Sequence, residues 1–218
     1  MTPPPLRILV VDDHAVVRRG VRALLESQPG WEVAAEATTG REAVELAKRL
    51  RPQVVVMDLS LPELNGLEAT RQILKESPET EVLILTMHQS EQLARDLLQA
   101  GARGYLMKSD ADQSLIAAVS SLRQHKPFLT SKVTEFVLDD YIRRGELRED
   151  APRDTITPRE REIIQLLAEG NSNKEAATVL GISVKTIEAH RANIMRKLHL
   201  RSVTDLVRYA IRNKIVQP

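Results

Sequence analysis

Residues 53–58 read Gln53-Val54-Val55-Val56-Met57-Asp58, an apolar run that ends in a carboxylate. A second run, Leu6–Val11, ends in the acidic pair Asp12-Asp13. Both runs are typical of buried strands. A carboxylate is costly to hold in an apolar setting unless another group pairs with it. If the two strands are parallel neighbours, all three carboxylates lie at one edge of the sheet, where open α/β sheets bind ligands.

Short apolar runs alternate with amphipathic segments from residue 6 to residue 125. The predicted strands are Leu6–Val11, Trp31–Ala37, Gln53–Met57, Val82–Thr86 and Gly104–Met107, and the predicted helices span residues 14–28, 40–50, 66–76, 90–100 and 111–124. Five strands that alternate with five helices predict a parallel sheet with helices on both faces. Since crossovers are right-handed, the predicted fold is an α/β doubly wound (βα)5 domain.

Length and composition limit the classes of protein. The chain has 218 residues, enough for one large or two small domains, and it has no Cys, which excludes disulfides and thiolate metal sites. No apolar stretch approaches the roughly 20 residues needed to cross a membrane. Residues Met1–Pro5 lack the charged start and apolar core of a signal peptide. We therefore expect a cytoplasmic protein with no membrane partner.

The charge of the chain is unevenly distributed. Residues 151–218 hold 12 Lys+Arg and 7 Asp+Glu, a net charge of +5, which leaves −4 for residues 1–150 within the total of +1. An acidic part joined to a basic part predicts two domains with different partners. The basic part is the candidate for nucleic-acid binding.

Two further polar residues follow predicted strands. Thr86 ends the fourth strand and Lys108 follows the fifth, so both would join Asp12, Asp13 and Asp58 at the same edge. Carboxylates are ligands for a hard cation such as Mg²⁺. A hydroxyl and an ammonium suit the oxygens of a phosphorylated carboxylate. Asp58 is then the candidate nucleophile, as in other enzymes that form an aspartyl phosphate.

This arrangement resembles the receiver domain of two-component response regulators over about residues 6–125. The matching segments are Asp12-Asp13-His14, Asp58-Leu59-Ser60-Leu61-Pro62-Glu63-Leu64-Asn65-Gly66, Thr86, and Gly101-Ala102-Arg103-Gly104-Tyr105-Leu106-Met107-Lys108. The resemblance implies that Asp58 is the phosphoacceptor. It also implies that Mg²⁺ is bound by Asp12, Asp13, Asp58 and the main-chain carbonyl of Ser60.

The same resemblance implies that Thr86, Tyr105 and Lys108 bind the phosphoryl group and act as a switch. Phosphorylation would draw Thr86 toward the phosphoryl oxygens, and Tyr105 would rotate inward. His88 lies near the position that tunes dephosphorylation in the family, although it could equally be an exposed loop histidine. Because the chain shows no ATP-binding Gly-rich motif, the phosphoryl group would come from a sensor histidine kinase.

Residues 155–214 read as four helices. The segment Thr157-Pro158-Arg159-Glu160 combines an N-cap, a proline at the first helical position and a capping-box Glu. Asn171 or Ser172, then Ser183 and Ser202, are the N-caps predicted for the other three helices. Gly181-Ile182 alone separates the second helix from the cap of the third. Such a tight turn with Gly is typical of a helix-turn-helix.

The basic part resembles the LuxR-type helix-turn-helix through three segments: Thr155–Ile164, Asn173–Ala177 and Ser183–Ile194. Together with the receiver domain, the chain resembles the NarL/FixJ family of transcriptional regulators. The predicted domains are a receiver at 1–125, a linker with a helical segment at 126–153, and an all-α four-helix DNA-binding domain at 154–218. The helical segment of the linker is predicted from the apolar spacing of Val133, Phe136, Val137 and Tyr141.

The third helix of the basic domain is the predicted recognition helix. Its apolar spacing predicts that Val184, Ile187, Ile194 and Leu198 face the core. The residues predicted to contact DNA are Lys174, Ser183, Lys185, Thr186, Glu188, Arg191, Asn193 and Lys197. Glu188 could accept from cytosine N4, or it could simply hold Arg191 or Lys185 on the helix. In the last helix, the family resemblance implies that Val203, Leu206 and Val207 contribute to a dimer contact.

The sequence therefore favours a phosphorylation-controlled transcriptional regulator. Phosphotransfer from a histidine kinase to Asp58 would switch homodimer formation and binding to double-stranded DNA. We do not expect an enzyme, although the protein could dephosphorylate itself. One alternative is a constitutive DNA-binding protein whose receiver is only a dimerisation module. Another is a phosphohydrolase of the haloacid dehalogenase type, but that signature needs a second Asp where Ser60 stands.

Overall fold

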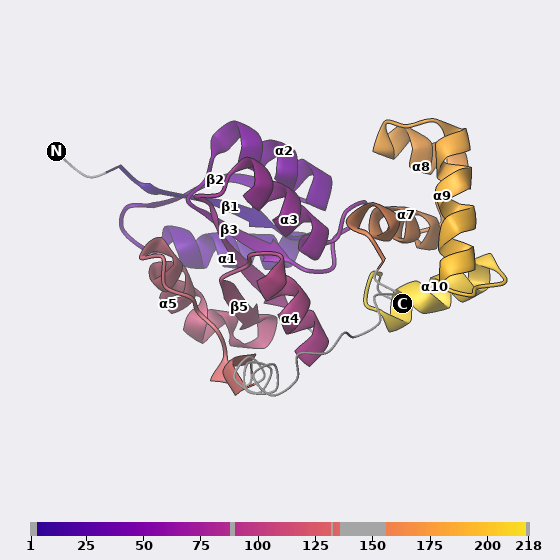
Figure 1. The fold of residues 1–218 in the computed structure, drawn as a ribbon. Helices are drawn as coiled ribbons and strands as arrows, with labels where there is room; N and C mark the ends of the chain where they lie inside the picture. The colour runs from indigo at the N-terminus through magenta and orange to yellow at the C-terminus, as the bar shows by residue number, and fades with distance from the viewer. Residues whose placement is uncertain (1–3, 88–89, 132, 136–155, 217–218) are drawn as a thin grey trace. The chain divides into compact units, whose positions relative to one another are not determined.

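The computed structural model describes residues 4–87, 90–131, 133–135 and 156–216. The chain forms two compact units, one built on a β-sheet and one built from helices. The first holds a parallel sheet in the order β2-β1-β3-β4-β5 (Figure 1). Its strands are β1 Leu6–Val11, β2 Trp31–Ala37, β3 Val54–Asp58, β4 Glu81–Thr86 and β5 Gly104–Met107. The predicted doubly wound fold is confirmed, and Asp58 is itself the last residue of β3.

Helices cover both faces of this sheet (Figure 1). They are α1 Ala15–Glu26, α2 Gly40–Leu50, α3 Gly66–Glu76, α4 Glu91–Gln99 and α5 Ala111–Arg123. Helices α1 and α5 pack on one face, where Ile8 and Val10 of β1 share a core with Leu25 of α1 and Leu115 of α5. Leu9, which is also fully buried, points to the opposite face. Since the central strands are buried on both faces, their sequences read as continuous apolar runs.

The chain beyond α5 folds back along the free edge of the sheet. The N–H of Phe128 donates to the carbonyl of Arg103 at 2.9 Å, and the N–H of Tyr105 donates to the carbonyl of Phe128 at 2.8 Å. The ring of Phe128 packs against the core shared with α5. The first residues after α5 are therefore tied to β5. Much of the predicted linker at 126–153 lies outside the described residues, including the helical positions Phe136, Val137 and Tyr141.

The second unit contains helices α7 Pro158–Ala168, α8 Asn173–Leu180, α9 Val184–Lys197 and α10 Val203–Arg212. Thr157, Ser172, Ser183 and Ser202 are their N-caps, each accepting a hydrogen bond from a first-turn N–H. The expected caps are thus confirmed, with Ser172 chosen over Asn171. Ile163, Ile187 and Leu206 belong to the core that these helices enclose.

Candidate functional site

The three predicted carboxylates meet at the carboxyl edge of the sheet. Val11 of β1 pairs with Met57 of β3, so Asp12 and Asp58 follow neighbouring positions on adjacent strands. Ligand atoms of Asp12, Asp13, His14 and Asp58 lie within 4.8 Å of one another. Asp12 and Asp58 are buried, whereas Asp13 is partly open to solvent. The structure therefore brings together the predicted acidic residues and adds His14, whose Nδ1 lies 2.7 Å from Oδ1 of Asp13.

Lys108 balances the two buried carboxylates. It follows β5, and its Nζ lies 2.7 Å from Oδ2 of Asp12 and 2.9 Å from Oδ2 of Asp58. Burial raises the pKa of the Asp58 carboxyl, although the hydrogen bond and charge of Lys108 oppose that shift. Burial acts to lower the pKa of the Lys108 ammonium, but its two carboxylate partners outweigh it and leave that pKa raised. Lys108 is therefore a cation at neutral pH.

The donor set of this cluster fits a hard divalent cation. All three acidic side chains offer oxygen ligands, which Mg²⁺ prefers. Oδ2 of Asp12 is buried and, apart from its ion pair with Lys108, has no hydrogen-bond partner among the described residues. Ser60, half-buried, stands two residues beyond Asp58 at the start of the loop that follows β3. A cation here would replace part of the charge that Lys108 supplies.

The loop after Asp58 closes tightly on the strand that precedes it. The N–H of Gly66 donates to the carbonyl of Leu59 at 2.8 Å, and the N–H of Leu59 donates to Oδ1 of Asp58 at 2.8 Å. A Cβ at Gly66 would lie 2.3 Å from the carbonyl oxygen of Asp58, closer than any side chain tolerates. Glycine at this position therefore lets helix α3 begin beside the acidic cluster.

Thr86 and Tyr105 lie on the two strands beyond β3. Thr86 ends β4 and is buried, and it pairs in register with Met107 of β5. Tyr105 is also buried, and burial raises the pKa of its phenol to about 12. The phenol of Tyr105 is thus largely shielded from water in the structure. His88 lies outside the described residues.

Sequence reasoning missed Arg18 of α1. Its Nη1 donates to the main-chain carbonyl of Asp12 at 2.8 Å, and its Nε lies 3.2 Å from Oε2 of Glu36 on β2. The available signal was a basic residue placed one turn into the helix that follows the acidic pair. Position in sequence alone did not say that its side chain would turn back to that pair.

The helix-turn-helix is formed by α8 and α9. Gly181 ends α8 with a positive φ of 62°, a conformation that glycine adopts without strain, and this makes the short turn possible. Among the predicted DNA-contacting residues, those exposed to solvent are Lys174, Ser183, Lys185, Glu188 and Asn193. The other three, Thr186, Arg191 and Lys197, are partly buried. Nζ of Lys197 lies 2.9 Å from Oε2 of Glu160, so this lysine also ties α9 to α7.

Two predictions for this domain need correction. Ile187 and Ile194 are buried as expected, but Val184 is 39% exposed. Val184 is the first residue of α9, so its side chain leans past the helix end, where no turn covers it. Leu206 is 1% exposed and lies within the domain core, so it is not available for the predicted dimer contact. Of the three predicted residues, Val203 is 45% exposed and Val207 is half-buried, so these two remain candidates for such a surface.

Comparison with known families identifies the first unit. Residues 8–120 match the family described as "Response regulator receiver domain". The chain is a response regulator. Residues 154–210 match a second family, described as "Bacterial regulatory proteins, luxR family". This response regulator therefore couples a receiver domain to a LuxR-type DNA-binding domain, which is the architecture of a phosphorylation-regulated transcription factor.

Relatives of this response regulator align over different lengths of the chain. The oxygen regulatory protein NreC of Staphylococcus epidermidis is 39% identical over 217 residues, 97% of this chain and 100% of the relative. A LuxR-family response regulator from Aurantimonas sp. SI85-9A1 is 37% identical with a TM-score of 0.59, over 63% of this chain and 99% of that chain. RcsB of Salmonella enterica serovar Typhimurium, bound to promoter rprA in the presence of phosphomimetic BeF3-, is 25% identical with a TM-score of 0.61, over 94% of this chain and 98% of that chain.

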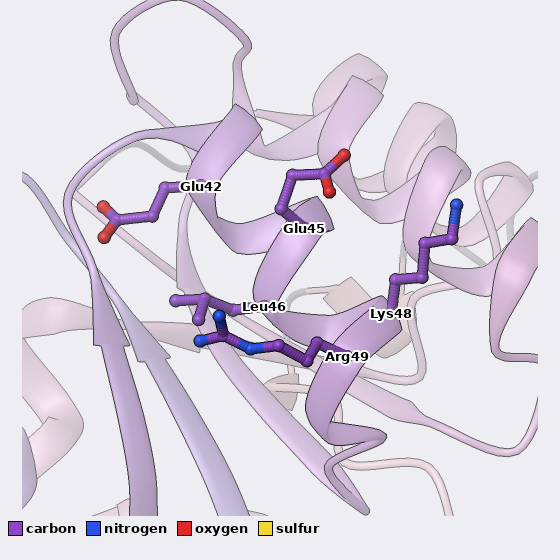
Figure 2. Close-up of a pocket in the computed structure, with 5 residues that line it drawn as sticks. All are labelled: Glu42, Glu45, Leu46, Lys48 and Arg49. Carbon is purple, nitrogen blue, oxygen red and sulfur yellow. The ribbon is translucent and has the colours of Figure 1, made fainter.

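A pocket elsewhere on the response regulator is distinct from the acidic cluster. It is lined by residues of α2: Glu42, Glu45, Leu46, Lys48 and Arg49 (Figure 2). The carboxylates of Glu42 and Glu45 point away from each other in this view (Figure 2). Within the part of the chain that the structure describes, no helix is long and apolar enough to span a membrane.

Proposed function

We propose that Asp58 is the phosphoacceptor of this response regulator and that its phosphorylation controls dimerisation and DNA binding. The observation that carries the proposal is the buried contact of Asp58 and Asp12 with Lys108 at the edge of the sheet. A buried cation between two carboxylates is a site already arranged for a phosphoryl group, which brings its own negative charge.

The chemistry follows from this arrangement. A carboxylate oxygen of Asp58 attacks the phosphorus, the bond from phosphorus to the donor breaks, and the donor leaves with that electron pair. A sensor histidine kinase is the donor, and the product is an acyl phosphate on Asp58. Lys108 and Thr86 then hold the phosphoryl oxygens. The residues that would hold Mg²⁺ are Asp12, Asp13, Asp58 and the carbonyl of Ser60, and the bound ion would neutralise the carboxylates and the incoming phosphoryl group.

The strand that leads to Lys108 offers a route toward the DNA-binding domain. β5 carries Tyr105, whose N–H is bonded to the carbonyl of Phe128 in the segment after α5. Tyr105 is buried, so phosphorylation would act by shifting the population between positions of a ring that is already shielded from water. A displacement of β5 would reach the segment that continues toward α7. A coupling of about 1–3 kcal/mol changes DNA affinity by roughly 5–150-fold.

The output would be binding of a homodimer to double-stranded DNA. Lys174, Lys185, Glu188 and Asn193 are exposed around the recognition helix, and Val203 and Val207 are the remaining dimer candidates. The complex of RcsB with a promoter in the presence of a phosphomimetic supports this reading. A bacterial regulator of this kind meets its DNA in the cytoplasm, where we expect this protein to act.

The test compares the full chain with Asp58→Asn, each incubated with Mg²⁺ and acetyl phosphate. Intact mass reports phosphorylation, light scattering reports dimerisation, and fluorescence anisotropy reports binding to a duplex selected by the phosphorylated protein from a random library. We expect a single adduct, dimers and tighter DNA binding for the natural protein alone. An unchanged phosphate response in the variant would overturn the proposal. Equal DNA binding with and without acetyl phosphate would favour the constitutive alternative.

A further inference from the structure

The main chain of Asp12 is held from outside the acidic cluster. Its N–H donates to the carbonyl of Ala37 on β2 at 3.2 Å, and its carbonyl accepts from Nη1 of Arg18 at 2.8 Å. Asp12 lies just beyond β1, where the ladder of the sheet ends. A buried carbonyl left without a donor would be costly, so Arg18 supplies a bond that the sheet does not.

Arg18 is itself held in place by Glu36. Nε of Arg18 lies 3.2 Å from Oε2 of Glu36, and both side chains are partly buried. The hydrogen bond from Arg22 lowers the pKa of the Glu36 carboxyl, burial opposes the shift, and the hydrogen bond from Arg18 adds to the lowering. Glu36 is therefore ionised at neutral pH. A planar guanidinium can donate to a carboxylate and to a carbonyl at the same time, in fixed directions. The ammonium of a lysine is a compact charge and would orient these two acceptors less firmly.

We propose that Arg18 and Glu36 are a positioning pair that fixes Asp12 for cation binding at the phosphorylation site. The pair joins α1 and β2 to the residue that follows β1, so it sets where the carboxylate of Asp12 points. Two further contacts hold the carboxylate itself: Oδ1 of Asp12 accepts from the N–H of His14 at 2.8 Å, and Oδ2 lies 2.7 Å from Nζ of Lys108. The inference rests on the proposed function, since it assigns Asp12 to the Mg²⁺ site.

The direction in which Mg²⁺ affinity changes when Arg18 is replaced separates a positioning role from a purely electrostatic one. Arg18 carries a positive charge close to a site for a cation, so removing that charge would by itself strengthen Mg²⁺ binding. Loss of positioning weakens it, because outer groups that orient a metal ligand contribute about 10–100-fold to metal affinity. The two explanations predict shifts of opposite sign for Arg18→Gln.

Arg22 provides a matched control on the same helix. Its Nη1 lies 2.9 Å from Oε1 of Glu36, and its Nε lies 3.1 Å from the carboxylate of Glu26. It thus shares Glu36 with Arg18, but its ion pairs join α1 to β2 and to the next turn of α1 rather than to Asp12. Arg22→Gln removes the same charge from the same network.

The experiment measures the initial rate of Asp58 phosphorylation by acetyl phosphate in the full chain, by intact mass, as Mg²⁺ is varied. We expect Arg18→Gln to raise the half-saturating Mg²⁺ concentration about tenfold or more, with a smaller change in the rate at saturation. Arg22→Gln should stay within about twofold of the natural protein. Glu36→Gln should shift in the same direction as Arg18→Gln but less, and Arg18→Lys should restore part of the affinity.

The outcomes distinguish this inference from the proposed function. An Mg²⁺ dependence of Arg18→Gln equal to or tighter than that of the natural protein would overturn the positioning role. Equal shifts in Arg18→Gln and Arg22→Gln would do the same, since they would reflect the shared network. Thermal unfolding of each variant checks that it is folded. If Arg18→Gln does not fold, the Mg²⁺ dependence of Glu36→Gln still tests the positioning role. Failure of the natural protein to be phosphorylated at Asp58 would instead remove the proposed function itself.

Discussion

The acidic edge of the receiver domain and the recognition helix α9 hold their charges in opposite settings. At the acidic edge, Asp12, Asp58 and Lys108 are nearly inaccessible to solvent and already paired. On α9, Lys185 and Glu188 are exposed. Buried charges must be paired when the domain folds, whereas exposed charges gain most of their energy when a partner arrives. Substitutions at the acidic edge should therefore change the free protein, and those on the open face of α9 should change only its complex with DNA.

The largest effect should come from Lys108→Ala. This change leaves the buried carboxylates of Asp12 and Asp58 without their cation, and breaking a buried pair in this way costs about 3–5 kcal/mol. Denaturant unfolding in Mg²⁺-free buffer would measure the loss. Mg²⁺ should restore more stability to Lys108→Ala than to the natural protein, because it supplies the missing positive charge.

Lys126→Ala is the control for this prediction, since Lys126 is an exposed lysine that contacts Gln124. Its unfolding free energy should stay within about 0.5 kcal/mol of the natural value. If Lys108→Ala were as stable as the control without Mg²⁺, the acidic edge would not be a pre-paired site. The contrast between paired, buried charges at the acidic edge and exposed charges on α9 would then be wrong.

A smaller effect is expected from the two faces of α9 itself. Ile187 is fully buried, so Ile187→Ala should lower the unfolding free energy by about 2–5 kcal/mol. Val184→Ala, three residues earlier, should change it by less than about 0.5 kcal/mol. Far-UV circular dichroism is the suitable probe, because the single tryptophan, Trp31, lies in β2 of the receiver. Similar losses for the two variants would mean that Val184 is covered after all.

Val184 also shows where sequence reasoning reaches its limit. Helical spacing placed it with Ile187 and Ile194, and the period was right for these two. Periodicity predicts the side of the helix on which a residue lies. It does not predict whether another element covers that side at the residue's position along the helix axis. Similarly, Leu206 was predicted to be a dimer contact together with Val203 and Val207, but it points inward because it shares a face with Ala210.

The acidic edge was more predictable because strand order alone brings its residues together. Asp12 and Asp58 both follow apolar runs, and parallel strands end on the same side of a sheet. The distances from Lys108 to both carboxylates depend on side-chain conformation, which no local pattern encodes. The bond from Arg18 to Asp12 is of the same kind, since a helical arginine reads as a solvated surface charge until the structure shows it turned inward.

The smallest effect should come from Lys185→Gln on the exposed side of α9. If Lys185 contacts a phosphate, losing that contact should weaken binding to all sequences alike and lower the slope of log affinity against log salt by about 0.9 for each bound copy of the chain. Between 50 and 200 mM salt, that slope corresponds to roughly a 3.5-fold difference per copy. Anisotropy titrations of the phosphorylated protein at several salt concentrations would measure both quantities.

Arg212→Gln is the matched control, because it removes the same charge from α10 of the same domain. A change in slope confined to Lys185→Gln would locate the contact on α9. Equal changes in the two variants would show that the net charge of the domain attracts DNA without a defined contact at Lys185. An unchanged slope together with altered preference between duplexes would instead assign Lys185 to a base edge, since base contacts discriminate sequence whereas phosphate contacts set the salt dependence. Unfolding of Lys185→Gln should match the natural protein in every case, because an exposed side chain contributes little before the DNA arrives.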